Sequence, residues 1–397
     1  MHVIGQTGTG KSRLLRNLLI QDILAGRGCM LVDPHGDLAE ELLEYVPPWR
    51  TEDLIYFAPA DLAYPIGLNL LDHVPPDERP LVASNVVAVF KHLWADSWGP
   101  RLEYILYQTI AALLDFPPEW GAVSLLGVPR MFTDQAYRAR VVEAIQDPRV
   151  RAFWEQEYPS YSASFRAEAV SPIQNKVGAF LSAPAVRNVL GQAKSTVDLA
   201  AVMNGSKIFI ANLSRGKLGE DKGNLLGSLL LTRVQLAAMS RANLPEEKRV
   251  DFVCCLDEAH NYTTNSFETV LSEARKYRLS LITVGQYLEQ MPPSLQAAIF
   301  GNVGSLVSFR VGHADAEVLA PEFTPYSAET LRDLRRGEVC VRLTADGEPC
   351  QPIIGKTVAE MGRRYNRRAV LIEQSRRRYG RRREEVEGKI GRWMASN

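Results

Sequence analysis

The sequence lacks several features that would assign it to a specialised class of protein. No apolar run in its 397 residues exceeds the length of a strand, so we expect no transmembrane segment in this chain. No signal peptide is visible, and no internal repeat recurs. The five cysteines are odd in number and have no metal-type spacing, which excludes a fully paired disulfide framework and predicts reduced core residues. We therefore expect a cytoplasmic globular protein.

The chain also lacks net charge, but its charges are unevenly distributed. The formal net charge is +0, and the charged (23%) and hydrophobic (46%) fractions are those of an ordinary globular protein. Residues 363–397 nevertheless contain eleven arginines and one lysine against four glutamates, a net charge of +8. We expect this basic tail to be helical. It either contacts nucleic-acid phosphates or is a solvated charged helix, and the sequence leaves both interpretations open.

A complete phosphate-binding loop of the pattern G-x-x-x-x-G-K-[ST] lies near the start of the chain. It consists of Gly5, Gln6, Thr7, Gly8, Thr9, Gly10, Lys11 and Ser12. An apolar strand-like segment, residues 1–4, precedes it, and residues 13–20 follow with helical spacing. Backbone N–H groups of such a loop bind the α- and β-phosphates, Lys11 would reach the β- and γ-phosphates, and Ser12 would hold Mg²⁺. The short strand leaves open whether a further domain precedes the loop.

A second element of nucleotide chemistry follows the apolar segment 252–256. Asp257 and Glu258 come directly after it, which is the Walker B pattern. Asp257 would organise Mg²⁺ through a water molecule, and Glu258 would act as the general base that polarises the attacking water. An acidic pair at a strand end can also simply cap the next helix. The complete phosphate loop upstream favours the catalytic interpretation.

Three further polar residues are candidates for the same site. Gln286 ends the strand-like segment 281–284 and would sense the γ-phosphate, or it is only a polar strand end. Arg275 is the first candidate for an arginine supplied in trans to a neighbouring subunit's nucleotide, and Arg310 competes for this role. The alternative for either arginine is a surface or salt-bridged position.

The organisation of the chain is that of an α/β protein with an insertion. Residues 1–71 and 206–362 alternate apolar strand-like runs with helical segments, which predicts a mostly parallel sheet covered on both faces. Residues 72–205 show helical periodicity broken by Pro and Gly, which predicts an inserted all-α domain. Residues 363–397 form the basic tail.

Together these motifs resemble the FtsK/HerA superfamily of motor ATPases. The resemblance covers most of residues 1–355 and also includes the segments Asp33-Pro34-His35-Gly36-Asp37, Asp257-Glu258-Ala259-His260 and Ser272 to Arg278. Within this superfamily the chain looks most like the conjugative coupling proteins of type IV secretion. The resemblance implies a RecA-like P-loop NTPase core with an all-α domain, a homo-hexameric ring with ATP between subunits, and translocation of DNA through the central pore.

The resemblance also implies roles for individual residues and partners. Lys11 and Ser12 match the nucleotide loop, Asp257 and Glu258 the Mg²⁺ and water positions, Gln286 the sensor and Arg275 the trans arginine. ATP and Mg²⁺ are the implied cofactors. DNA and type IV secretion or relaxase proteins are the implied partners, and a partner would bring the chain to the inner face of the membrane. Two alternatives stay open, a secretion ATPase acting on proteins and an ATP-gated interaction module, and DNA-stimulated ATPase activity distinguishes them from a DNA motor.

Overall fold

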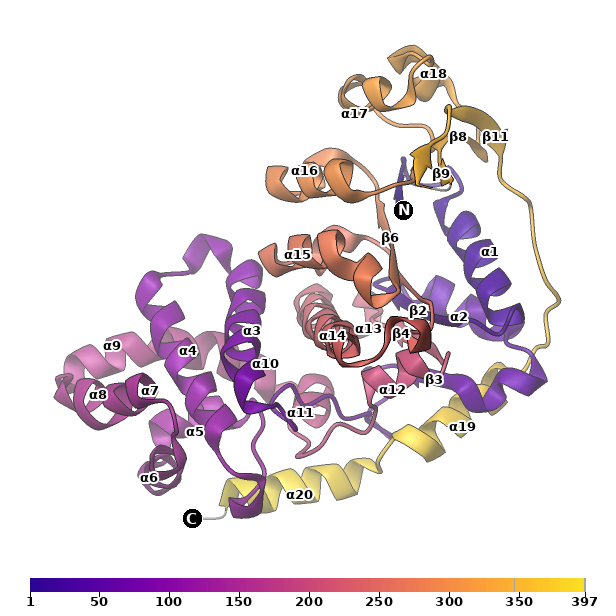
Figure 1. The fold of residues 1–397 in the computed structure, drawn as a ribbon. Coiled ribbons are helices and arrows are strands. Elements are labelled where there is room, and N and C mark those ends of the chain that lie inside the picture. The colour runs from indigo at the N-terminus through magenta and orange to yellow at the C-terminus, as the bar shows by residue number, and fades with distance from the viewer. Residues whose placement is uncertain (346, 396–397) are drawn as a thin grey trace. The chain divides into compact units, whose positions relative to one another are not determined.

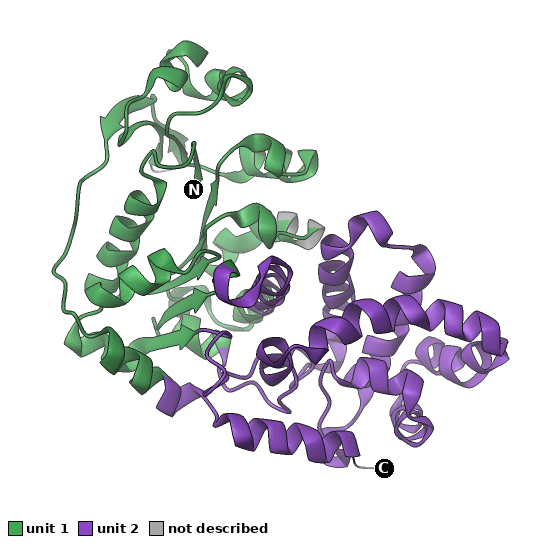
Figure 2. Ribbon diagram, turned by 180° about the vertical axis from the view of Figure 1, so that it is seen from behind, with its two compact units in different colours: residues 1–57, 199–215, 234–375 green, residues 58–198, 216–233, 376–397 purple. Residues whose placement is uncertain are grey.

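The computed structural model describes residues 1–345 and 347–395, and the chain folds into two compact units (Figures 1 and 2). Unit 1, green in Figure 2, comprises residues 1–57, 199–215 and 234–375. Unit 2, purple, comprises residues 58–198, 216–233 and 376–397. Residues 72–205, the predicted insertion, supply most of unit 2, and the predicted domain boundaries themselves remain a prediction.

Unit 1 is built on a nine-stranded, mostly parallel sheet. Its strands are β1 (His2–Ile4), β2 (Gly28–Asp33), β3 (Leu54–Phe57), β4 (Ile208–Asn212), β5 (Phe252–Leu256), β6 (Leu279–Gly285), β7 (Leu306–Ser308), β8 (Glu338–Arg342) and β11 (Ile353–Lys356). Their order is β11-β8-β7-β1-β6-β5-β2-β4-β3. Among these nine strands, β8 alone runs in the opposite direction, so its pairings with β7 and β11 are antiparallel. A short separate hairpin joins β9 (Thr344–Ala345) and β10 (Glu348–Pro349). The predicted α/β fold is confirmed.

The alternation of side chains along each strand explains why both faces of the sheet are covered. In β2, Cys29 and Leu31 belong to the apolar cluster that also contains Leu15 and Leu19 of the first helix. Met30 and Val32 point to the other face and are equally buried. A strand buried on both faces reads as a continuous apolar run, which is the pattern the sequence displayed.

Helices of unit 1 lie on both sides of this sheet and at its ends (Figure 1). They are α1 (Lys11–Leu24), α2 (Asp37–Leu42), α12 (Leu199–Asn204), α15 (Asn265–Glu273), α16 (Pro293–Asn302), α17 (His313–Leu319) and α18 (Ala328–Asp333). Three further helices contain the boundaries between the units, namely α13 (Arg215–Leu218), α14 (Glu220–Ser240) and α19 (Arg368–Tyr379).

Unit 2 is helical, and its described residues form no strand. Its helices are α3 (Arg79–Leu93), α4 (Pro100–Asp115), α5 (Gly127–Thr133), α6 (Gln135–Ala144), α7 (Pro148–Ala152), α8 (Tyr158–Ser160), α9 (Ala163–Ile173), α10 (Ala179–Ser182), α11 (Pro184–Leu190) and α20 (Arg383–Ala395). Among the helices of the described residues, none combines the length and the apolar character needed to span a membrane.

The central helix of unit 2, α4, illustrates how the sequence specifies these elements. Pro100 occupies its first turn, where the missing N–H costs no hydrogen bond. Leu102, Ile105, Leu106 and Leu113 recur at helical spacing and are buried. Two prolines follow directly after Phe116, and this pair prevents the helix from continuing.

The basic tail folds back onto the protein. Within unit 1, the extended segment 357–367 leads into the tail and runs alongside α1 (Figure 1). There Arg16 and Asn17 donate hydrogen bonds to the carbonyls of Ala359 and Val358. α19 and α20 then make the tail helical, as the sequence predicts. Several of its arginines pair with carboxylates of the same unit, so the positive charge of this segment is partly neutralised within the fold. The pairs are Arg364 with Glu41, Arg368 with Glu40, and Arg376 with Asp61.

Candidate functional site

The phosphate loop connects β1 to α1, and two of its glycines are required by close packing. Gly5 lies so close to Phe309 that a Cβ atom added there would overlap the phenylalanine side chain. Gly10 has φ +125°, and an added Cβ would lie 3.1 Å from the Phe309 ring. The carbonyl of Ile4 accepts a hydrogen bond from Phe309 N (2.8 Å), and Gln6 N donates to the carbonyl of Arg310 (2.9 Å). The end of β7 therefore supports one side of the loop.

Lys11 begins α1 and turns its ammonium group back into the loop. Its Nζ donates hydrogen bonds to the carbonyls of Gly5 and, at 3.1 Å, of Gln6. Burial lowers the pKa of Lys11, and the nearby carboxylates of Glu258 and Asp257 act in the opposite direction. The lysine is thus held at the mouth of the anion site, between the loop carbonyls and the acidic pair.

The acidic pair stands at the end of β5, as the sequence predicts. Asp257 is 7% exposed and Glu258 is 5% exposed. Burial, together with the nearby carboxylates of Asp33 and Glu258, raises the pKa of Asp257 to about 7. Glu258 has φ +49°, a strained left-handed conformation for a residue other than glycine. Buried carboxylates that lie this close together favour the binding of a cation.

Gln286 forms a bridge between the phosphate loop and the acidic pair. Its Nε2 donates to Glu258 Oε1 (2.7 Å), and its Oε1 accepts a hydrogen bond from Thr7 Oγ1 (3.0 Å). The other carboxylate oxygen of Glu258 lies 3.6 Å from His260 Nδ1. A change in the position of Thr7 would therefore reach Glu258 through the amide of Gln286 alone.

These residues line one cavity of about 310 Å³. It is bounded by Thr7, Gly8, Thr9, Gly10, Lys11, Ser12, Arg13, His35, Asp257, Glu258, Gln286, Arg336 and Gly337. The topology explains the convergence, because β1, β2, β5 and β6 are parallel and end at the same edge of the sheet. Ligands of open α/β sheets bind at this carboxyl edge.

The two candidate arginines lie at opposite edges of the sheet. Arg310 follows β7 at the carboxyl edge, where its Nε donates to Gln6 Oε1 of the same subunit's loop (3.3 Å). Arg275 is exposed in the turn before β6 and lines a cavity of about 860 Å³ at the amino edge, together with Lys276 and Arg278. The structure therefore brings Arg310, but not Arg275, next to the nucleotide loop of its own subunit.

The sequence motifs did not identify Arg336, and they included His35 only as part of the segment 33–37. Both line the cavity, and both are exposed there. His35 follows β2, and its backbone N–H is held by Asp33 Oδ1 (2.8 Å). Arg336 precedes β8, whose antiparallel direction brings its first residues to the carboxyl edge. No local motif marks Arg336, so only the strand direction could have identified it.

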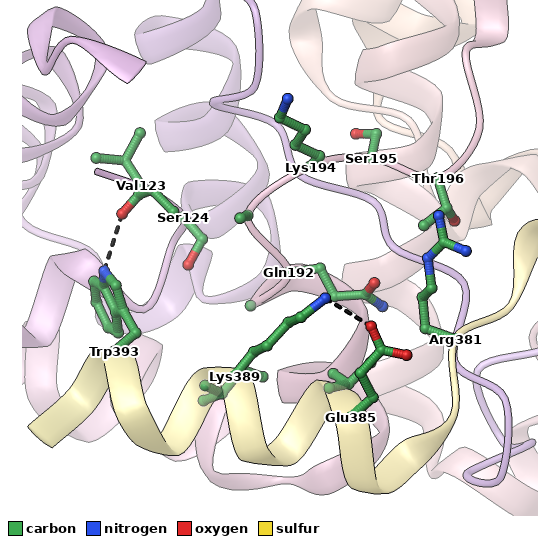
Figure 3. Close-up of a pocket in the computed structure, with 15 residues that line it drawn as sticks. Val123, Ser124, Gln192, Lys194, Ser195, Thr196, Arg381, Glu385, Lys389 and Trp393 are labelled. Atoms are coloured by element: carbon green, nitrogen blue, oxygen red, sulfur yellow. Dashed lines mark hydrogen bonds and ion pairs between the residues drawn. The ribbon is translucent and has the colours of Figure 1, made fainter. Parts of the chain in front are cut away.

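A larger cavity of about 510 Å³ lies within unit 2, between α20 and two loops (Figure 3). Glu385 and Lys389 of α20 form an ion pair (2.6 Å) at its edge. Trp393 donates from Nε1 to the carbonyl of Ala122 (2.9 Å). The Trp393 contact attaches α20 to the rest of unit 2. The cavity holds none of the phosphate-loop or acidic residues of unit 1. It is therefore not the candidate nucleotide site.

The fold and the loop geometry define the architecture of a P-loop NTPase. Among solved structures, the chain is similar to the bacterial conjugative coupling protein TrwB. With the form bound to sulphate it shares 18% identity at a TM-score of 0.65, covering 92% of this chain and 87% of that one. With TrwB in complex with ADP and Mg²⁺ it shares 16% identity at a TM-score of 0.64, over the same fractions. The resemblance predicted from the motifs is thus confirmed at the level of the fold.

A second similar structure is VirB4 of Thermoanaerobacter pseudethanolicus. It shares 15% identity with this chain at a TM-score of 0.59, and the match covers 90% of this chain and 89% of VirB4. No protein-family model matches the sequence, and no curated protein matches it by sequence comparison.

Proposed function

We propose that this protein is an ATP-hydrolysing motor that moves DNA through a homo-hexameric ring, as in conjugation or type IV secretion. One observation carries the proposal. The loop that leads into α1 and the residues after β5 and β6 converge on one cavity, which Lys11 and Glu258 both line. The similarity of the whole chain to a conjugative coupling protein supports the choice of motor.

The arrangement can perform phosphoanhydride hydrolysis with ATP as the default substrate. Glu258 would accept a proton from the attacking water while the water oxygen bonds to the γ-phosphorus. The bond between the γ-phosphorus and the β–γ bridging oxygen would break and release ADP. Lys11 and the loop N–H groups would neutralise the phosphate oxygens. The Ser12 hydroxyl and Asp257 would hold Mg²⁺, which neutralises the charge that develops on the β- and γ-phosphates. The gathered carboxylates around Asp257 fit this cation.

The ring rests on the position of Arg275. It precedes the seven-residue strand β6, and Gln286 follows that strand. At about 3.3 Å per residue, the two side chains start about 20 Å apart. Arg275 thus faces away from its own nucleotide site and is exposed for a neighbour's, which a ring of identical subunits would provide. Arg310, beside its own loop, fits a contact in cis better.

DNA, type IV secretion proteins and a relaxase are the proposed partners, with the helical unit 2 facing the substrate. TrwB is described as a plasmid coupling protein, and the chain shares its fold over 92% of its residues. We place the protein in the cytoplasm, at the inner face of the membrane when a partner recruits it.

Steady-state ATP hydrolysis, with and without double- and single-stranded DNA, tests this function. Glu258→Gln serves as the blank. Strong stimulation by DNA supports the motor, and the preferred strand type identifies the substrate. Hydrolysis that is indifferent to DNA would instead favour an ATPase that moves proteins or an ATP-gated interaction module.

A further inference from the structure

The loop directly before β8 lines one side of the nucleotide cavity. It contains Arg335, Arg336 and Gly337, directly before β8. Gly337 N donates a hydrogen bond to the carbonyl of Thr9 in the phosphate loop (2.9 Å). The carbonyl of Gly337 accepts a hydrogen bond from Thr357 N (2.8 Å). The loop is therefore held between the phosphate loop and the segment that follows β11.

The direction of β8 explains why this loop reaches the site. β8 pairs antiparallel with β7, with Leu306 opposite Arg342 and Ser308 opposite Cys340. The first residues of β8 therefore lie beside the last residues of β7, at the edge where the parallel strands end. Gly337 has φ +81°, a left-handed turn that glycine adopts without strain. This turn carries the chain from the cavity wall into β8.

Arg336 lies at the cavity, and its guanidinium is free to bind a ligand. It is exposed, it lines the cavity with Lys11 and Ser12, and within residues 1–345 and 347–395 no hydrogen bond or ion pair of its side chain is found. The acidic pair Asp257 and Glu258 lines the same cavity from the end of β5. Since β5 and β8 lie on opposite sides of β1 in the sheet, the acids and the arginine flank the phosphate loop from opposite sides.

We propose that Arg336 binds phosphate oxygens of the nucleotide held by its own subunit. A planar guanidinium pairs with phosphate in a bidentate fashion, and its charge would add to that of Lys11 in holding a polyanion. The assignment rests on the proposed nucleotide site and adds a cis arginine to it, distinct from the trans role of Arg275. Its backbone support comes from Gly337, so the side chain can be changed without loss of the contact to Thr9.

Equilibrium binding of a fluorescent ADP analogue to the full chain tests the assignment. Arg336→Ala is expected to weaken binding about tenfold or more, the usual effect of removing one charge-assisted hydrogen bond. Arg336→Lys should retain part of the affinity. Arg335→Ala is the matched control, because the neighbouring arginine does not line the cavity, and its affinity should equal that of the wild type.

Competition with inorganic tripolyphosphate identifies the part of the nucleotide that Arg336 contacts. If the contact is to phosphate, Arg336→Ala weakens tripolyphosphate and ADP in parallel. Unchanged affinity for tripolyphosphate would overturn the proposal and assign the arginine to the base or the ribose. A lower melting temperature of nucleotide-free Arg336→Ala, with Arg335→Ala unaffected, would also overturn it, because the loss would then arise from folding.

The Lys11→Ala variant separates this inference from the proposed function. Binding that is lost in Lys11→Ala but unchanged in Arg336→Ala would confirm the nucleotide site and refute the role of Arg336. A wild-type protein that binds neither ADP nor tripolyphosphate would refute both.

Discussion

The two edges of the unit 1 sheet carry charge in different ways. At the carboxyl edge, the cavity collects Lys11, Asp257, Glu258 and Arg336 from three loops far apart in the sequence. At the amino edge, Arg275, Lys276 and Arg278 come from a single turn of four residues, and all are exposed. The carboxyl edge has a buried acidic pair beside its lysine, whereas no cation of this turn is buried.

Under the proposed function, this difference would let one sheet serve two nucleotides, its own at the carboxyl edge and that of a neighbouring subunit at the amino edge. A site that binds and cleaves must gather opposite charges and exclude water, which requires several strands to end together. An arginine that acts on a neighbouring subunit's nucleotide needs only to be exposed on a rigid segment, and a single turn can provide this. The predictions below test this comparison.

The largest effect is expected for Arg275→Ala. An arginine supplied in trans to phosphoryl transfer is worth about 10³–10⁵ in kcat, and we expect a loss of this order. Lys276→Ala, at the same edge, should keep normal hydrolysis. In assemblies that mix wild-type and Arg275→Ala subunits, activity should depart from proportionality to the wild-type content, and strict proportionality would refute a trans role.

Glu258→Gln tests the carboxyl edge. Removal of the general base should lower kcat about 10²- to 10⁴-fold, while nucleotide binding persists because the phosphate loop is intact. Glu246→Gln, an acid that lines the amino-edge cavity, is the matched control and should leave hydrolysis unchanged. Normal turnover by Glu258→Gln in single-turnover and steady-state assays would contradict the assignment of the base.

Protonation of His2, which is buried in β1 between the two edges, should destabilise the folded protein. His2 of β1 is 1% exposed, and its Nδ1 lies 2.9 Å from Thr283 Oγ1. Burial, together with the nearby N-terminal amino group, lowers the pKa of His2 from 6.5 to about 4. As the pH falls below 6.5, His2 becomes protonated in the unfolded chain but stays neutral in the folded chain. About 3 kcal/mol of stability should therefore be lost between pH 6.5 and 4.

Urea unfolding at several pH values between 7 and 4 measures this loss. His2→Gln should have a flatter pH dependence of the free energy of unfolding than the wild type, since glutamine does not titrate. His313→Gln, which changes an exposed histidine, should leave the slope unchanged. Equal slopes for all three proteins would show that His2 is solvated in solution.

The smallest effect is expected in the basic tail. Arg364 and Arg368 pair with carboxylates of α2, so they are already engaged within unit 1. We expect the double variant Arg364→Ala/Arg368→Ala to change the slope of log K against log salt for DNA binding by less than about 0.5. Two arginines that contact phosphates would instead reduce it by about 1.8. DNA-binding titrations at increasing salt distinguish these results.

The sequence by itself determined the parts of the protein that depend on local chemistry. The glycine spacing between Gly5 and Gly10 predicted the phosphate loop, because those backbone torsions and the approach of Phe309 admit no side chain. Continuous apolar runs before Asp257 and Gln286 predicted buried parallel strands with polar groups at their ends. Helical periodicity predicted the helices of unit 2 and of the tail for the same local reason.

Only the tertiary structure decided how distant segments meet. The antiparallel direction of β8 places Arg336 at the nucleotide cavity, and the pairing of β1 with β6 lets Gln286 join Thr7 to Glu258. The same strand directions separate Arg275 from Arg310, which competed for one role in the sequence. The fold also pairs the tail arginines with acids more than 300 residues away. Strand order and direction follow from the packing of the whole core, and no local pattern encodes them.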